Sequence, residues 1–343
     1  MRLSTWARGR GVPDRAGVVR LSVAGLWVAA LALGALVGSN LAGMQGGFVV
    51  NTAQTLVPLT LVAAGLVTLA AAMMRHWALA TVAGVVVVGH LVLVMPALGP
   101  ASTPVSGAEV ETGRLRVFSA NLHFANPDVG PIAREIVGSD ANVVALQEVT
   151  ETHLASLRAA GVVDMYPHTL LDPRSGGFGS AILSKTPVTD ARVVDLAGVP
   201  MSRATLLVGG RPVELFNVHT MAPVGTQRLA ARDRQLDALA LMSRADSAGP
   251  DGDDPRAHIV VGDFNASRWH PAFRRLLDLG GLHDAHEQAG RGLARTWPNE
   301  SLLPRFALLD HVLLSPTVSA VAVREATGEG SDHRPVVADL RVR

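Results

Sequence analysis

The sequence predicts a two-part α/β protein, in which three transmembrane helices precede a domain of packed β-sheets flanked by helices. Residues 21–98 hold nearly all of the long apolar runs, and Arg75 is the only formal charge among them. From Leu115 onward, many short runs of strand length alternate with fewer helical stretches. This pattern favours sheets packed face to face over a fully alternating parallel fold.

Three apolar stretches, at residues 21–41, 55–74 and 77–98, each have the ~20 residues that a helix needs to cross a bilayer. A cleaved signal peptide is the alternative for the first stretch, but two more spans follow it. We therefore expect three transmembrane helices in residues 21–98, preceded by a basic cytoplasmic tail at residues 1–20. His90, inside the third span, is expected to be neutral and bonded to a neighbouring helix.

Basic residues beside the spans predict their orientation. Five Arg precede the first span, residues 42–54 contain no Lys or Arg, the next turn holds Arg75, and no further basic residue occurs before Arg114. Because basic residues stay in the cytoplasm, we expect a cytoplasmic N-terminus and an extracytoplasmic domain at 114–343, in a multi-pass protein of the cell membrane. Residues 99–113, rich in Pro, Ser, Thr and Gly, are the expected linker.

Charge and composition exclude several functions. Residues 1–104 carry a net charge of +5 and the remainder −4, so the expected domain has no basic footprint for nucleic acid, a partner that we do not favour. The chain has no Cys, which excludes thiolate nucleophiles and cysteine-ligated zinc. Walker, GxSxG and HExxH motifs are also absent from the sequence, which argues against NTPases, serine hydrolases and zincins.

The periodicity of the soluble part predicts its elements. Strands are expected at residues 115–120, 143–147, 180–184, 204–208, 213–218, 258–261, 311–314 and 335–340. Helices are expected at residues 131–137, 152–160, 226–245 and 271–279. The acidic run at 251–254 lacks the spacing of a calcium loop and is expected to be a solvated turn.

Polar side chains that bind metals or phosphate end several of these apolar runs. They are Asn121, Glu148, His219, Asp263 with Asn265, and Asp332 with His333 in a loop near the C-terminus. One such residue is usually a turn former, but a whole set of acids, amides and imidazoles without thiols fits a hard-cation site for phosphate chemistry. Carboxylate and amide oxygens suit Mg²⁺ or Mn²⁺.

These motifs resemble, in order, those of the endonuclease/exonuclease/phosphatase (DNase I-like) superfamily. The matching segments are Asn121, Gln147–Glu148, Asn217–His219, Gly262–Asn265, Leu309–Ser315 and Ser331–Pro335. The resemblance covers residues 114–343. It implies a four-layer sandwich of two mixed β-sheets with helices outside, and a metal-dependent phosphodiesterase or phosphatase.

The same resemblance implies a metal site that holds Mg²⁺ or Mn²⁺. Glu148 resembles the principal ligand, Asn121 lies beside it, and Asp332 closes the same coordination region.

Five further residues take catalytic roles by this resemblance. Asp263 would hold the attacking water, and Asn265 would orient it and contact the phosphate. His333 would lie at the scissile phosphate, with Asp310 fixing its tautomer and favouring its charged form. His219 would bind a phosphoryl oxygen or assist the leaving group. Together they would stabilise an anionic, crowded phosphorus during in-line attack by water.

The remaining histidines are expected to be surface or packing residues: His123, His153, His168, His258, His270, His283, His286 and, on its strand, His311. Family members sometimes contact phosphate at the positions of Ser180, Arg203 and Arg305, whose roles stay open.

A few spans followed by an external domain resemble the actinobacterial membrane-anchored members of the teicoplanin-resistance (VanJ) type. This resemblance implies a phosphorylated cell-envelope substrate, such as a lipid-linked phosphate, which a site tethered above the bilayer would favour by effective concentration. The alternatives are an extracellular nuclease and, in another class, a non-catalytic envelope binding protein. The intact set of Glu148, Asp263 and His333 argues against the last.

Overall fold

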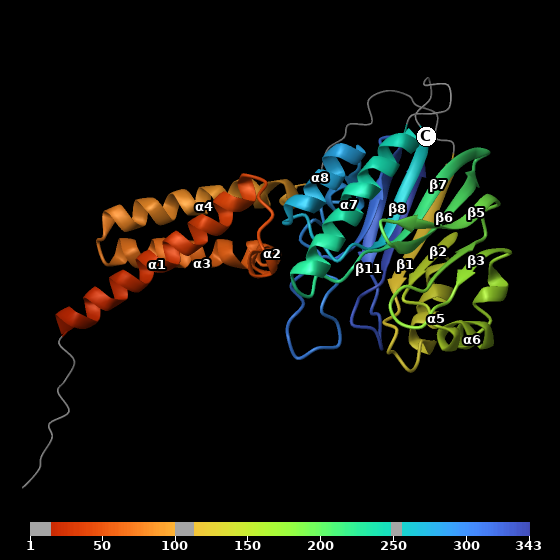
Figure 1. Ribbon diagram of the computed structural model, residues 1–343, viewed down its shortest axis with the longest axis horizontal. Helices are drawn as coiled ribbons and strands as arrows, with labels where there is room; N and C mark the ends of the chain where they lie inside the picture. Colours follow the sequence, from red (N-terminus) through yellow and green to blue (C-terminus); the bar gives the residue numbers. More distant parts are fainter. Residues whose placement is uncertain (1–14, 100–112, 248–255) are drawn as a thin grey trace, which may run out of the picture.

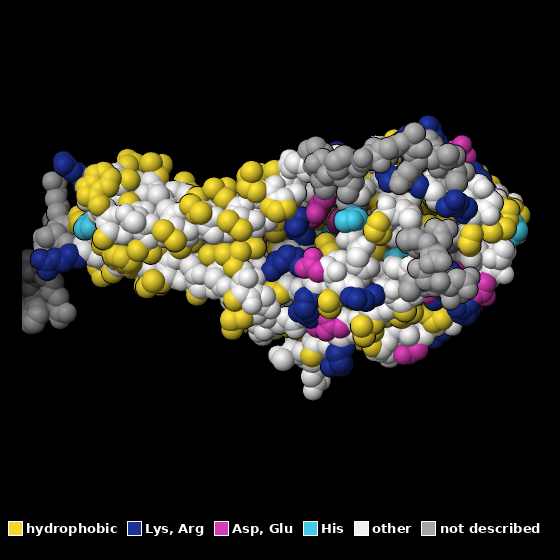
Figure 2. Space-filling view, turned by 90° about the horizontal axis from the view of Figure 1, so that it is seen from above, with side chains coloured by type: hydrophobic (Ala, Val, Ile, Leu, Met, Phe, Trp, Pro, Cys, Tyr) yellow, Lys and Arg dark blue, Asp and Glu magenta, His cyan; other side chains and the backbone are white. Residues whose placement is uncertain are grey.

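The computed structural model describes residues 15–99, 113–247 and 256–343, which form a helical arm and a β-sandwich domain (Figure 1). The arm consists of α1 (Arg15–Leu41), α2 (Phe48–Thr55), α3 (Val57–Met73) and α4 (Trp77–Leu98). Hydrophobic side chains cover much of its outer surface, with Lys or Arg at its far end and charged side chains of both signs where the arm meets the domain (Figure 2). The predicted linker at 100–112 and the turn at 251–254 lie outside the described residues.

Two helices of the arm, α1 and α4, are each long and apolar enough to cross a membrane. The second predicted span differs from the expectation, because α3 is 17 residues long and meets α2 at an angle of 80°. A third span exists only if this bent pair counts as one. Pro58 in the first turn of α3 lacks an N–H and favours a helix start, which explains the break at Leu56.

Three details of the arm also bear on the predictions. Helix α1 begins at Arg15, inside the expected tail, and α2 occupies part of the expected loop at 42–54. His90 on α4 lies with its Nε2 3.0 Å from Oγ1 of Thr60 on α3, as expected for a histidine that bonds a neighbouring helix.

The domain contains two six-stranded mixed sheets packed face to face, which confirms the predicted fold class. The first sheet has the order β11 (Val318–Glu325), β12 (Val336–Val342), β1 (Gly113–Asn121), β2 (Val143–Gln147), β4 (Ser180–Ser184), β3 (His168–Asp172). The second has the order β5 (Val188–Leu196), β6 (Val199–Val208), β7 (Arg211–His219), β8 (Ala257–Asp263), β10 (Asp310–Leu314), β9 (His283–Asp284). The strands β3, β5, β9 and β11 were not predicted.

Helices cover the outer faces of the sheets. On the first sheet lie α5 (Gly130–Ser139), α6 (Glu151–Ala159) and the short η1 (Val163–Met165), and the second carries α7 (Thr226–Ser247) and α8 (Pro271–Gly280). The short α9 (Ala285–Gln288) contacts β11 of the first sheet and β10 of the second, and its Ala285 belongs to the cluster between the sheets. Successive side chains of a strand point to opposite faces of its sheet, so the strands contribute to three hydrophobic clusters. Val117 and Leu215 point between the sheets, while Phe118 and Phe216 point outward under the helices.

Strand direction gathers the motif residues at one end of the sandwich. The pairs β1–β2 and β7–β8 are parallel at the centre of their sheets, so their carboxyl ends lie together. Strand β10 runs antiparallel to β8 and pairs Asp310 with Asp263, and β12 runs antiparallel to β1. The starts of β10 and β12 therefore reach the same end.

Candidate active site

The amide of Asn121 lies at the centre of the site. Its Nδ2 donates to Oε1 of Glu148 at 3.0 Å and to Oδ2 of Asp263 at 3.1 Å, which joins the two sheets. Its Oδ1 accepts from the backbone N–H of His123, which fixes the orientation of the amide. Two carboxylates from different sheets thus converge on one neutral donor.

Glu148 directly follows β2 and has a left-handed backbone, with φ at 58°. Its Oε2 accepts from the backbone N–H of Phe124 at 2.8 Å, and its side chain is 13% exposed. A non-glycine residue in this conformation costs of order 1 kcal/mol and needs support from its surroundings. The bonds to Asn121 and Phe124 supply that support and aim the carboxylate into the site.

Asp263 ends β8 and is almost fully buried. Its Oδ1 accepts from the backbone N–H of Asn265 at 2.8 Å, and Asn265 Nδ2 donates to the carbonyl of Thr220 at 3.0 Å. The preceding Gly262 has φ at +134°, and a Cβ there would lie 1.9 Å from the carbonyl oxygen of Val218. Only glycine allows β8 to approach β7 this closely, which explains the first residue of the Gly262–Asn265 motif.

His333 lies between two carboxylates. Its Nδ1 is 2.8 Å from Oδ2 of Asp310, and its Nε2 is 3.6 Å from Oδ2 of Asp263. Burial alone lowers the pKa of His333, but the carboxylates of Asp310 and Asp263 outweigh it and raise the pKa to about 10. Burial raises the pKa of Asp263, and the neighbouring His333 opposes this effect.

His219 faces the same carboxylates from the end of β7. Its Nδ1 donates to the carbonyl of Gly177 at 2.6 Å. Its Nε2 is therefore directed inward, 3.6 Å from both Glu148 Oε1 and Asp263 Oδ2. The site thus places two imidazoles and two carboxylates around one polar end of the sandwich.

The predicted residue that lies apart from this cluster is Asp332. Its carboxylate is 44% exposed and 3.6 Å from Nδ1 of His123 at the rim. Neighbouring residues of one loop point to different sides, so His333 turns inward while Asp332 faces solvent. The structure brings the other seven predicted residues together.

Beneath the site, two amides that carried no predicted role connect the sheets. Gln147 Nε2 donates to Oδ1 of Asn217 at 2.6 Å, and Asn217 Nδ2 donates to the carbonyls of Leu146 and Ala181. The sequence indicated these two amides only by including them in the Gln147–Glu148 and Asn217–His219 motifs. Ser331 is a further missed residue, since its Oγ donates to the carbonyl of Asn121 at 2.7 Å and accepts from the N–H of His333.

Comparison with known proteins assigns this arrangement to a family. The profile of the Endonuclease/Exonuclease/phosphatase family matches residues 118–333. The chain belongs to this family. Its members hydrolyse phosphoester bonds with divalent metals. The comparison with curated protein sequences gives no match, so the likeness to the teicoplanin-resistance type remains a prediction.

Solved structures share the fold. An endonuclease/exonuclease/phosphatase from Bacteroides vulgatus is 20% identical, covering 67% of this chain and 99% of its own, with a TM-score of 0.55. One from Beutenbergia cavernae is 23% identical, covering 67% and 72%, with a TM-score of 0.55. Truncated Caenorhabditis elegans TDP2 is 19% identical, covering 67% and 98%, with a TM-score of 0.56.

The residues of this family member fit a divalent cation. Glu148 and Asp263 offer carboxylate oxygens that share a single amide donor, and Asp310 adds a third carboxylate within 4.8 Å of Asp263. The carboxylates of Glu148, Asp263 and Asp310 carry more negative charge than the charged ring of His333 compensates, so a cation would stabilise them. Oxygen-rich donors match Mg²⁺ or Mn²⁺ more closely than metals that prefer thiolates.

His311, Arg203 and Ser180 are each held by bonds to other protein groups. His311 is buried on β10, with Nδ1 2.6 Å from Oδ2 of Asp284 and Nε2 3.0 Å from the carbonyl of Ala266. Arg203 pairs with Glu214 and Asp246, away from the site. Ser180 bonds Ser202 between the sheets, so neither Ser180 nor Arg203 is free to contact a phosphate here.

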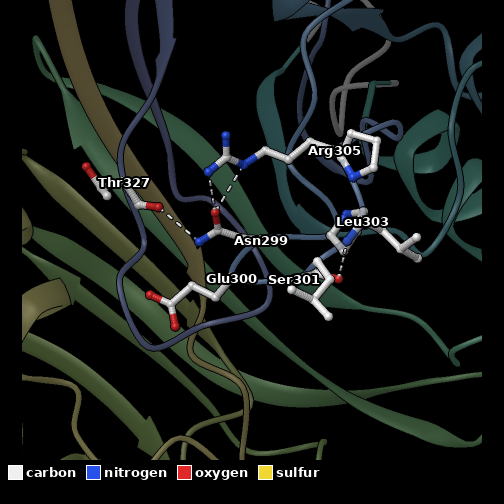
Figure 3. A pocket seen from close by; sticks show the side chains of 9 residues that line it. Asn299, Glu300, Ser301, Leu303, Arg305 and Thr327 are labelled. Carbon is white, nitrogen blue, oxygen red and sulfur yellow. Dashed lines mark hydrogen bonds between the residues drawn. The ribbon is translucent and has the colours of Figure 1, made fainter.

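Arg305 has a different position, in an open pocket of about 710 Å³ beside the site (Figure 3). Its guanidinium donates twice to Oδ1 of Asn299, whose backbone N–H donates to the carbonyl of Asp332 at 2.7 Å. The pocket loop is therefore tied to the loop that carries His333. Leu302 and Leu303 extend from the same loop into solvent.

Proposed function

We propose that this chain is a membrane-anchored, divalent-metal-dependent phosphoester hydrolase with an extracytoplasmic active site, acting on a lipid-linked or other cell-envelope phosphate. The convergence of Glu148 and Asp263 on Asn121, with two imidazoles 3.6 Å from the Asp263 carboxylate, is the observation that carries the proposal. A degenerate binding domain would not be expected to keep this buried polar set.

The site residues would have different roles in hydrolysis. Glu148 would hold the cation, and Asn121, whose amide donates to Glu148, would keep that carboxylate in position. When bound, the cation neutralises phosphate charge and favours attack by water. Asp263 accepts a hydrogen bond from the water, and Asn265, fixed by Thr220, orients it. Each of these contacts requires a pre-positioned side chain, because positioning and charge stabilisation lower the barrier by several kcal/mol.

The two histidines would stabilise the phosphoryl oxygens. Asp310 accepts from Nδ1 of His333, which directs Nε2 to the substrate and keeps the ring charged. Gly177 plays the corresponding part for His219 through its carbonyl. A charged ring can donate to a non-bridging oxygen and then protonate the leaving oxygen.

Two features support a membrane substrate. The helical arm, whose helices α1 and α4 could cross a bilayer, contacts the domain through Asn40, which donates to the carbonyl of Trp269. The basic residues of the sequence favour a cytoplasmic N-terminus. Apolar side chains are also exposed around the site: Phe124, whose N–H binds Glu148, and Leu303 of the pocket loop are 48% and 62% exposed. An apolar lipid group would find contacts there that a free sugar phosphate would not use.

The test is a substrate panel with the purified full chain in detergent micelles and Mg²⁺. Polyprenyl pyrophosphates, polyprenyl phosphates, phospholipids, DNA and RNA would be compared by kcat/KM, with Asp263→Asn as the inactive control. We expect the highest kcat/KM on a polyprenyl or other lipid phosphate. Hydrolysis of DNA or RNA with none of the lipid phosphates would refute the substrate class and favour the nuclease.

A further inference from the structure

The loop after β8 contacts both the candidate active site and the helical arm. It begins with Phe264 and Asn265 and ends at His270, where α8 starts. Trp269 in this loop is 5% exposed and packs in one hydrophobic cluster with Val37 and Val57 of the arm. The carbonyl of Trp269 accepts from Nδ2 of Asn40 at 2.6 Å.

Helix α2 makes the second set of contacts to this loop. Figure 1 shows α2 at the end of the arm that faces α7 and α8. His270 Nδ1 accepts from the backbone N–H of Ser267, so its Nε2 carries the hydrogen and donates to the carbonyl of Asn51 at 3.1 Å. Asn51 is itself 5% exposed, which is unusual for an asparagine on a short helix beside a membrane.

Arg232 of α7 joins these two parts. It is among the largest fully buried side chains in the described part of the chain, and only 1% of it is exposed. Its Nη1 donates to the carbonyl of Asn265 at 3.0 Å, its Nη2 donates to Oδ1 of Asn51 at 2.8 Å, and both Nε and Nη2 donate to Asp233. The planar guanidinium of Arg232 therefore contacts the helical arm and the active-site loop at once.

The residue that Arg232 holds needs such support. Asn265 has a left-handed backbone, with φ at 46°, and its N–H fixes Oδ1 of Asp263. A non-glycine residue keeps this conformation only when its surroundings over-determine it. Rotation of this peptide would withdraw the N–H from Asp263 and move the Asn265 amide away from Thr220.

We propose that Arg232 is a positioning residue for Asn265 and Asp263, and that Asn51 of α2 completes it, so that turnover depends on the docking of α2 against the domain. The inference rests on the proposed function of Asp263 and Asn265. Without the Asn51 acceptor, a buried N–H of the guanidinium loses its partner, and this loss favours rotation of the guanidinium toward another acceptor. Such a rotation would release the Asn265 carbonyl.

The experiment compares variants of the full chain in detergent micelles. Asn51→Leu removes the acceptor at similar volume, Asn51→Asp keeps an acceptor oxygen, and Thr52→Val changes the exposed neighbour as a matched control. Steady-state hydrolysis of the soluble diester bis(p-nitrophenyl) phosphate with Mg²⁺ separates kcat from KM. Amide hydrogen exchange of residues 264–270 measures the loop without requiring activity.

We expect Asn51→Leu to lower kcat about tenfold, which corresponds to about 1.4 kcal/mol, with KM changed less than about twofold. Exchange in residues 264–270 should be about tenfold faster in Asn51→Leu alone, while Asn51→Asp and Thr52→Val match the wild type. Equal exchange and equal kcat in Asn51→Leu and Thr52→Val would overturn the proposal. So would an equal loss in Asn51→Asp, because the hydrogen bond would then not be the cause.

An inactive wild type with every phosphoester would count against the proposed function. The hydrogen-exchange comparison would still test whether α2 holds the loop at 264–270 through Arg232. Faster exchange in Asn51→Leu supports this link, and unchanged exchange refutes it.

Discussion

Raising the pH should weaken the domain through one buried histidine, His286. The ring is fully buried, with Nδ1 3.4 Å from Oδ1 of Asp284 and Nε2 3.5 Å from Oε1 of Glu325. Burial alone lowers the pKa of His286, but the two carboxylates outweigh it and raise the pKa from 6.5 to about 9. Against the effect of burial, His311 and His286 lower the pKa of Asp284, and bonds from His286 and Arg291 bring that of Glu325 to about 2.

The size and sign of the effect follow from these values. A pKa raised from 6.5 to about 9 corresponds to about 3 kcal/mol of stabilisation, at about 1.4 kcal/mol for each tenfold change in proton affinity. Because the folded pKa lies above the unfolded one, this stabilisation is complete below pH 6.5 and is lost as the pH rises to about 9. The free energy of unfolding should therefore fall by about 3 kcal/mol through this ring.

The assay is denaturant unfolding of the full chain in micelles, followed by tryptophan fluorescence between pH 6.5 and 9.5. Other groups titrate in this range, so the slope is compared with that of His286→Gln, and His283→Gln serves as the exposed control on the same segment. We expect a shallower slope in His286→Gln alone. Parallel loss of stability in the wild type and His286→Gln would refute the reasoning.

Three further predictions concern the site and the topology. Asp310→Asn removes the charge that holds His333 and should lower kcat about tenfold in steady-state kinetics, less than His333→Ala does; an effect equal to that of His333→Ala would contradict a purely orienting role. Gly262→Ala should destabilise the domain by about 3 kcal/mol or more in denaturant unfolding, because its Cβ would lie 1.9 Å from the Val218 carbonyl; unchanged stability would contradict the close approach of β8 to β7. A reporter active only outside the cytoplasm should be active when fused after Arg343, and activity of a cytoplasm-only reporter at that point would overturn the proposed orientation.

The central strands and the residues that end them were predictable. Runs such as those of β2 and β8 are buried throughout and end in Glu148 and in Asp263, so a polar residue there is conspicuous. The sequence could not show the edge strand β5, because most of its side chains are exposed and its polarity does not alternate. Its pairing with β6 creates the strand, and that contact is not visible in the run itself.

The helical arm shows a second limit of prediction from the sequence. Residues 48–55 contain Asn51 and Gln54, and polar residues between apolar spans predict a loop. The structure buries both on α2, where Arg232 supplies the partner of Asn51 from 181 positions along the chain and Gln54 donates to the carbonyl of Met44. In the same way, the sequence cannot show that His333 turns inward while Asp332 faces solvent, since both follow from the path of one loop.

The most direct test of the account measures phosphoester hydrolysis before and after removal of divalent metal, in the wild type and in Asp263→Asn. Exhaustive chelation of the full chain should abolish turnover, and Mg²⁺ or Mn²⁺ should restore it in the wild type. With metal restored, Asp263→Asn should retain less than about one hundredth of the wild-type kcat, because it loses a pre-positioned charged acceptor at the site. Full turnover after chelation, or near-normal kcat in Asp263→Asn, would contradict the account.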